Sequence, residues 1–254
     1  AGDTGLAVVP VYNLIDGLIT ETPDRIHHGD LRIFAAVRVP IQIAVGFGDP
    51  LRENGAVYSH PKALAQCSDY LTEHHPQRER IAVNSTAEGV ERALAEGGVA
   101  LASRAAFQAR GVPIAVDDAT NDYLGRTNYT EFLLVGASHL GARVTGEAPS
   151  YRTLLACDPQ DDRPGLLAGL LSQLAFWHLH LARIHARPAQ RATATDLDPQ
   201  VFYLEIMGTL SDEVRDVLMA SLSIGLRGGQ DSRPQILGEY PSDRVQLILS
   251  AALR

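Results

Sequence analysis

Several polar side chains lie together at the expected start of one helix, where they could bind a carboxylic acid. Asn84, Ser85 and Thr86 precede or open the segment 86–96, and Glu88, three residues after Ser85, completes the spacing of a capping box. A helix N-terminus has partial positive charge and free N–H groups, so these hydroxyl and amide groups could bind a carboxylate. Helix capping by Ser85 alone also explains the pattern, and the two roles are compatible.

Histidines and aspartates give two further patterns, which could hold a metal. His178 and His180 alternate onto one face of an expected strand, and His185 follows them. No acidic or thiol residue nearby has the spacing of a zinc ligand set. Asp117, Asp118 and Asp122 lack the glycine and glutamate spacing of a calcium loop. We therefore expect no metal site.

Composition describes a folded chain with an acidic surface. The 254 residues are 45% hydrophobic and 20% charged, and the formal net charge is −8. A net negative charge of this size creates an electrostatic field that repels phosphate backbones and anionic lipid headgroups, so nucleic acid and membranes are not expected partners. Cys67 and Cys157 lack Cys-x-x-Cys spacing, which predicts free thiols in a reducing compartment. With no signal peptide at Ala1, we expect a cytoplasmic protein.

Alternating strand and helix patterns predict an α/β fold. Residues 137–149, rich in glycine, form the best linker, and we expect domains at 1–145 and 146–254. The second domain has the element order βαββαβ of a ferredoxin-like module. Expected strands are 6–10, 31–39, 41–47, 80–83, 99–102, 112–116, 129–135, 151–156, 178–187, 202–207 and 235–238. Expected helices are 61–75, 86–96, 103–110, 164–176 and 211–222, with a helical segment inside 13–25.

Four stretches of the first domain resemble prephenate dehydratase. They are Ala-Val-Val-Pro at 7–10 followed by Asn13, Tyr-Ser-His-Pro-Lys-Ala-Leu-Ala-Gln-Cys at 58–67, Ser-Thr-Ala-Glu at 85–88, and Asn-Tyr-Thr-Glu-Phe at 128–132. The last is similar to the Asn-x-Thr-Arg-Phe signature of that family. The stretches occur in the family's order, which makes chance similarity a poor explanation.

The second domain resembles the regulatory ACT domain that follows the dehydratase domain in that family. Pro-Gly-Leu-Leu at 164–167 stands where the family has Pro-Gly-Ala-Leu. Ile-His-Ala-Arg-Pro at 184–188 stands where it has Ile-Glu-Ser-Arg-Pro, and Leu-Gly-Glu-Tyr-Pro at 237–241 matches a closing Leu-Gly-x-Tyr-Pro. The resemblance therefore covers residues 5 to 241.

The resemblance implies a two-lobed, periplasmic-binding-protein-like dehydratase domain followed by a ferredoxin-like ACT domain. The implied reaction is loss of water and carbon dioxide from prephenate, a cyclohexadienyl acid, without a metal or organic cofactor. Thr130 is the implied catalytic residue, although a β-branched residue in a strand is common for packing alone. The implied substrate-binding residues are Asn13, Ser59, His60, Asn84, Ser85, Thr86, Arg126, Asn128, Glu131 and Phe132. The implied regulatory residues, for an aromatic amino acid effector at a homodimer interface, are Gly165, Leu167, His185, Arg187 and Pro188.

Three departures from the family pattern affect substrate binding. Glu131 replaces the signature arginine, and exchanging plus for minus at about 4 Å changes each charge–charge energy by several kcal/mol at an effective dielectric of about 20. Arg126, His60 or Arg104 could supply the missing positive charge. Leu14 replaces a family serine, which removes a hydroxyl. The family's opening glycine-rich loop has no counterpart from Ala1 onward, so we expect that segment to be absent and a sheet edge to be exposed.

The regulatory motif departs as well. His185 and Ala186 replace the family's acidic and hydroxyl residues, so an α-amino group would lose its anionic partner and feedback by phenylalanine is expected to weaken.

Taken together, the motifs of both domains favour a lyase of the prephenate dehydratase type. Two alternatives stay open: a relative with altered chemistry, such as a prephenate decarboxylase, and a non-catalytic protein that binds a ligand.

Overall fold

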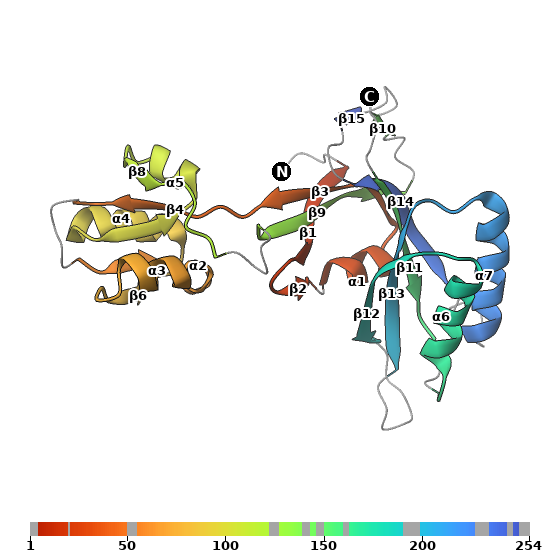
Figure 1. Ribbon diagram of the computed structural model, residues 1–254. Helices are drawn as coiled ribbons and strands as arrows, with labels where there is room; N and C mark the ends of the chain where they lie inside the picture. The colour runs from red at the N-terminus through yellow and green to blue at the C-terminus, as the bar shows by residue number, and fades with distance from the viewer. Residues whose placement is uncertain are drawn as a thin grey trace. The chain divides into compact units, whose positions relative to one another are not determined.

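The computed structural model describes residues 5–19, 21–49, 55–121, 127–138, 143–145, 150–159, 163–189, 199–226, 234–242 and 246–248. The chain divides into two compact units (Figure 1). Unit 1 combines Ala1–Arg38 with Glu131–Arg254, and unit 2 is the continuous segment Val39–Thr130. Unit 2 is therefore an insertion between two parts of unit 1.

Unit 2 contains a five-stranded mixed sheet with helices on both faces. Its strands lie in the order β6-β5-β7-β4-β8, and β5 runs parallel to β6 and β7 while β4 runs antiparallel to β7 and β8. One face packs around Val57 and Leu71, and the other around Val90 and Phe107. The elements are β4 (Ala44–Phe47), β5 (Val57–Ser59), α2 (Pro61–Gln66), α3 (Ser68–His74), β6 (Arg80–Ala82), α4 (Thr86–Glu96), β7 (Val99–Ala102), α5 (Arg104–Gln108) and β8 (Ile114–Val116).

The single helix expected over residues 61–75 is two helices in the structure. Cys67 separates them, because its backbone leaves the helical region with φ −115° and ψ 18°. The Cys67 side chain is fully buried in the core beside Leu71. The hydrophobic periodicity continued across this position, so it could not reveal the break.

Among the described residues, one helix and four strands come from the N-terminal segment of unit 1 and from the strand that returns to unit 1 directly after unit 2. They are β1 (Leu6–Asn13), β2 (Gly17–Leu18), α1 (Glu21–His28), β3 (Leu31–Pro40) and β9 (Tyr129–Ala137). The helical segment expected within 13–25 begins at Glu21 as α1 and runs on to His28, since a turn at Asn13 and the strand β2 occupy the first half of the range. In α1 the side chain of Ile26 is buried.

The C-terminal part of unit 1 has the predicted βαββαβ order. Its elements are β11 (Ser150–Cys157), α6 (Leu166–Phe176), β12 (Leu181–Pro188), β13 (Gln200–Met207), α7 (Asp212–Leu226) and β14 (Gln235–Ser242). These strands are antiparallel, in the order β12-β13-β11-β14. A short pair, β10 (Arg143–Thr145) and β15 (Gln246–Ile248), lies outside this sheet.

Both parts of unit 1 share one sheet of eight strands, in the order β12-β13-β11-β14-β3-β9-β1-β2. The joint is a parallel pairing of β14 with β3, where Ser242 lies opposite Ala36. The boundary expected at residue 145 therefore does not coincide with the division into compact units, because β3 and β9 continue the sheet of β11 to β14.

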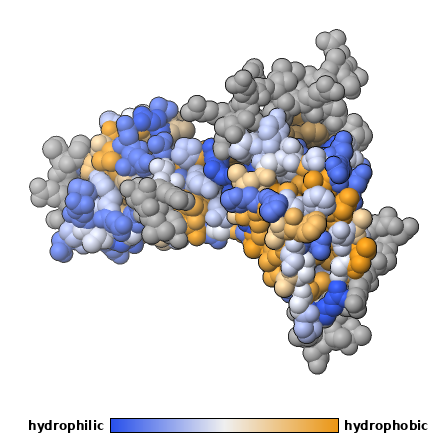
Figure 2. Space-filling model, turned by 45° about the vertical axis from the view of Figure 1, so that its right-hand side comes forward, coloured by the Kyte–Doolittle hydropathy of each residue, from blue (hydrophilic) through white to orange (hydrophobic). Residues whose placement is uncertain are grey.

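Two cores lie on opposite faces of the C-terminal strands. Helices α6 and α7 cover one face through Leu170, Leu218 and their neighbours. The other face packs against β1, α1 and β9, where Tyr203 and Leu133 are buried. Figure 2 shows apolar surface on unit 1. The exposed apolar residues of α6 and α7 are Leu167, Phe176, Val217 and Ile224. Among the described residues, no helix is long and apolar enough to span a membrane.

Candidate active site

Asn128 is the predicted site residue with the most unusual surroundings. Its side chain is fully buried, and neither Oδ1 nor Nδ2 has a hydrogen-bond partner among the described residues. Its backbone carbonyl accepts a bond from the Ile41 N–H at 2.8 Å. Leaving a buried polar group unpaired costs about 1–3 kcal/mol. A polar ligand bound here could supply the hydrogen bonds that the amide lacks, so Asn128 is a candidate for ligand binding.

Thr130 and Phe132 lie just beyond Asn128 at the start of β9. Both are half-buried, and they alternate along the strand with the buried residues Glu131 and Leu133. Because successive side chains of a strand point to opposite faces, Thr130 and Glu131 face different surroundings. Arg126, predicted to bind substrate, lies outside the described residues.

Glu131 is buried in a cluster of charges. Its Oε1 accepts a bond from Arg183 at 2.8 Å, and its Oε2 accepts bonds from Arg38 Nε at 2.9 Å and from Arg183 at 3.2 Å. Arg152 lies 3.4 Å from the same carboxylate and bonds Glu205 at 2.5 Å. The cluster joins β9 and β3 to β11, β12 and β13.

The environment of Glu131 corrects the expectation that it faces a dianionic substrate. Burial by itself raises the pKa of this carboxyl, but hydrogen bonds from Arg183 and Arg38 and the charges of Arg183 and Arg152 lower the pKa below its usual value. The group is thus a carboxylate whose charge the protein itself balances, with 1% of the residue exposed. Sequence reasoning missed its three arginine partners, since nothing local marks residues so far apart.

Two further predicted residues, Ser59 and His60, connect β5 to α2. The Ser59 hydroxyl is buried and donates to the Leu101 carbonyl at 2.6 Å, so it fastens β5 to β7. The His60 ring is exposed, and its Nδ1 accepts a bond from the Lys62 N–H at 3.2 Å as the N-cap of α2. Ser59 therefore stabilises the sheet, and the His60 ring stands at a helix start.

The capping box predicted at α4 is confirmed. Ser85 Oγ accepts a bond from the Glu88 N–H at 3.1 Å, and Glu88 Oε2 accepts bonds from Asn84 N and Nδ2 at 3.1 and 3.2 Å. Thr86 is the first helical residue and is half-buried. The polar atoms of Asn84 and Ser85 are thus used at least in part by their own chain.

Asn13 in unit 1 also uses its side chain to bond nearby backbone groups. It is buried, and its Oδ1 accepts bonds from the N–H groups of Ile15 and Asp16, each at 3.0 Å. This side chain holds the turn between β1 and β2. Leu14, one residue later, lies in that turn.

The predicted regulatory residues occupy two places in unit 1. Gly165 caps α6 with φ +83°, a conformation that favours glycine, and Leu167 in the first turn is partly exposed. On β12, the pKa of His185 is lowered first by burial and then by Arg183. Arg187 and Pro188 close the strand, and Pro188 is exposed.

Arg187 is engaged within the chain. Its Nε and Nη2 lie 3.0 and 2.8 Å from Asp24 Oδ2 on α1, and the Tyr203 hydroxyl donates to Asp24 Oδ1 at 2.8 Å. A ligand carboxylate at Arg187 would have to compete with the Asp24 carboxylate. This partner was also missed, because it lies 163 residues away in the sequence.

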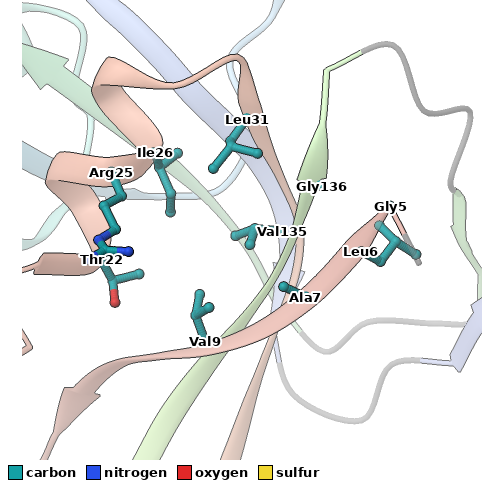
Figure 3. Close-up of a pocket in the computed structure, with 10 residues that line it drawn as sticks. All are labelled: Gly5, Leu6, Ala7, Val9, Thr22, Arg25, Ile26, Leu31, Val135 and Gly136. Carbon is teal, nitrogen blue, oxygen red and sulfur yellow. The ribbon is translucent and has the colours of Figure 1, made fainter. Parts of the chain in front are cut away.

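Unit 1 contains a cavity of about 410 Å³ between β1, α1 and β9 (Figure 3). None of the predicted catalytic, substrate-binding or regulatory residues lines it. Within the described ranges, no group of three or more histidine, cysteine, aspartate or glutamate side chains could hold a metal ion.

Comparisons with known proteins agree with the motifs. The sequence profile of the family described as prephenate dehydratase matches residues 1–139. A bifunctional chorismate mutase/prephenate dehydratase of Stutzerimonas stutzeri is 28% identical over 95% of this chain and 62% of its own length. A prephenate dehydratase of Mycolicibacterium vanbaalenii is 31% identical over 84% of this chain and 66% of its own length.

A crystal structure of prephenate dehydratase from Arthrobacter aurescens in complex with L-Phe superposes with a TM-score of 0.70 at 26% identity. The match covers 93% of this chain and 75% of that one. The chain thus spans less than two thirds of the length of the two curated relatives above. Since the family profile covers more than half of the sequence, this chain belongs to the prephenate dehydratase family.

Proposed function

We propose that this protein removes water and carbon dioxide from prephenate, or from a closely related cyclohexadienyl acid, to give an aromatic keto acid. The observation that supports this most directly is the buried amide of Asn128, which has no hydrogen-bond partner among the described residues and lies two residues before Thr130 on the strand that carries the family signature. Such an amide can donate to a substrate carboxylate and accept from a substrate hydroxyl.

The reaction breaks two bonds to the ring. Cleavage of the bond to the carboxylate releases an electron pair into the ring, and the bond to the C4 oxygen breaks as that oxygen leaves with an electron pair. The bond between the ring and its carboxylate breaks, carbon dioxide leaves, and the electron pair makes the ring aromatic. The C4 hydroxyl leaves and takes up a proton, so the balanced products are the keto acid, carbon dioxide and water. In our proposal the Thr130 hydroxyl donates to the leaving oxygen, and Asn128 helps to hold the acid in place.

The test follows phenylpyruvate formation from prephenate by absorbance. We expect Thr130→Ala to lower turnover by about 10²–10⁴-fold, the usual contribution of a positioned acid. Thr72→Ala is the matched control, because Thr72 is an exposed threonine of α3 whose hydroxyl donates to the Ser68 carbonyl. No turnover by the wild-type protein would refute the proposal.

Asn128→Leu separates a ligand-binding role from a structural one. A leucine of similar volume removes the unpaired polar atoms. The free energy of unfolding should therefore rise by about 1–3 kcal/mol, while turnover falls. A structural asparagine would give the opposite result, with stability lost together with activity.

Two alternatives from the sequence predict different products. A prephenate decarboxylase would release carbon dioxide and keep the ring unaromatised, so product analysis by mass identifies it. A non-catalytic binder is favoured by the side-chain bonds that already occupy Asn13, Ser59 and Ser85. That protein would bind prephenate without consuming it.

We further propose that residues 146–254 form an ACT-like regulatory domain and mediate a homodimer, and that the dehydratase domain is two-lobed like a periplasmic binding protein. The βαββαβ order and the likeness to a relative solved with L-Phe support this. Two buried free cysteines are compatible with a cytoplasmic location. At 100 times its dissociation constant, an aromatic amino acid should add about 2.7 kcal/mol of stability in a thermal shift, and sedimentation measures the dimer.

A further inference from the structure

The cavity in unit 1 has apolar walls and a buried floor. Val9 and Leu31 are half-buried on its sides, and Ile26 and Val135 are buried beneath it. Ala7 contributes only a methyl group to the wall, which leaves space open. At about 410 Å³ the cavity is within the size range of pockets that hold small organic ligands.

Polar groups gather at one side of this cavity. Figure 3 shows Thr22 and Arg25 together on α1, with Gly5 and Leu6 on the opposite side. The Thr22 hydroxyl donates to the Pro10 carbonyl at 2.6 Å.

Arg25 is the charged group of this lining. It forms an ion pair with Glu21 on the preceding turn at 3.9 Å, and both side chains are 81% exposed. An exposed pair of this length holds the guanidinium weakly, so the group can turn to an incoming anion. The cavity therefore offers an apolar body and one cationic end.

We propose that this cavity binds a monoanion with an apolar body, of the class of aromatic monocarboxylates. The ring would lie against Val9, Leu31 and Val135, and the carboxylate would accept hydrogen bonds from Arg25. The site is separate from the residues of the proposed dehydratase reaction, so either proposal can fail without the other.

The test compares two fluorescent probes that share one aromatic system. The anion 1-anilinonaphthalene-8-sulfonate should bind wild-type protein about tenfold more tightly than neutral N-phenyl-1-naphthylamine, as expected for a charge-assisted bond. Arg25→Gln should abolish this preference and leave the neutral probe bound. Phenylacetate, an aromatic monocarboxylate, should displace the anionic probe.

Two controls locate the binding. Ala7→Ile places a strand-forming side chain in the cavity and should weaken both probes. Arg32→Gln removes an exposed arginine of β3 that does not line the cavity, and it should change nothing. The proposal is overturned if neither probe binds, if Arg25→Gln keeps the preference for the anion, or if Ala7→Ile leaves binding intact. It is also overturned if probe binding disappears as sedimentation shows dimer formation, because a second copy then fills the cavity.

Discussion

Replacing Glu131 by glutamine should destabilise the protein more than almost any other conservative change. The side chain is 2% exposed, and Arg183 and Arg38 bond it at 2.8 and 2.9 Å. Glutamine keeps the shape but removes the negative charge that Arg38, Arg152 and Arg183 share, while Glu205 still pairs with Arg152 and Arg183. Breaking a buried ion pair by removing one partner costs about 3–5 kcal/mol. A typical domain has only about 5–15 kcal/mol of stability, so this is a large share.

Urea denaturation at pH 7 measures this cost, and its pH dependence identifies the cause. The arginines lower the pKa of Glu131 in the folded protein below its value in the unfolded chain, which is about 4.3. The group therefore contributes stability above pH of about 4.3, and this contribution is lost as the pH falls through the folded pKa. The difference between wild type and Glu131→Gln should shrink on acidification.

Glu213→Gln is the matched control, because Glu213 is exposed in the first turn of α7. It should change the free energy of unfolding by less than about 0.5 kcal/mol. A Glu131→Gln cost below about 1 kcal/mol, or one that does not change between pH 7 and pH 3, would refute the view that charge pairing fixes this residue.

Three further changes test the fold. Ser85→Ala should lower stability by about 1 kcal/mol in urea denaturation, because it removes the N-cap of α4. Gly48→Ala should lower it severely, since a Cβ would lie 1.8 Å from the Ala93 carbonyl oxygen, whereas Gly169→Ala in α6 meets open space and should raise stability by about 0.5–1 kcal/mol. The pKa of the Cys157 thiol, raised by burial to about 12, predicts no reaction with a thiol reagent until the protein unfolds.

Local signals carried most of the correct predictions. The Ser85 capping box started α4 where expected, and Gly97 in the left-handed region ended it. The βαββαβ order of the C-terminal part followed from strand and helix periodicity. The break at Cys67 was missed, because the apolar repeat runs through it without a turn residue.

Contacts between distant residues could not be predicted. Arg38 and Arg183 lie 93 and 52 residues from Glu131, so the sequence showed a lone acid where the folded protein has a balanced cluster. For the same reason Arg187 looked available to an effector, although Asp24 holds it. The motif placed Asn128 among the candidates, but only the structure shows that its amide has no hydrogen-bond partner within the described part of the chain.

The insertion of unit 2 into unit 1 sets the order in which the protein can mature on the ribosome. Unit 2 is one continuous segment, so it can fold as soon as Thr130 has left the exit tunnel. Unit 1 must wait for β14, which pairs with β3 and is translated after the whole of unit 2. Until β11 and β12 emerge, Glu131 lacks two of its three arginines, and of the three only Arg38 is already present in the nascent chain.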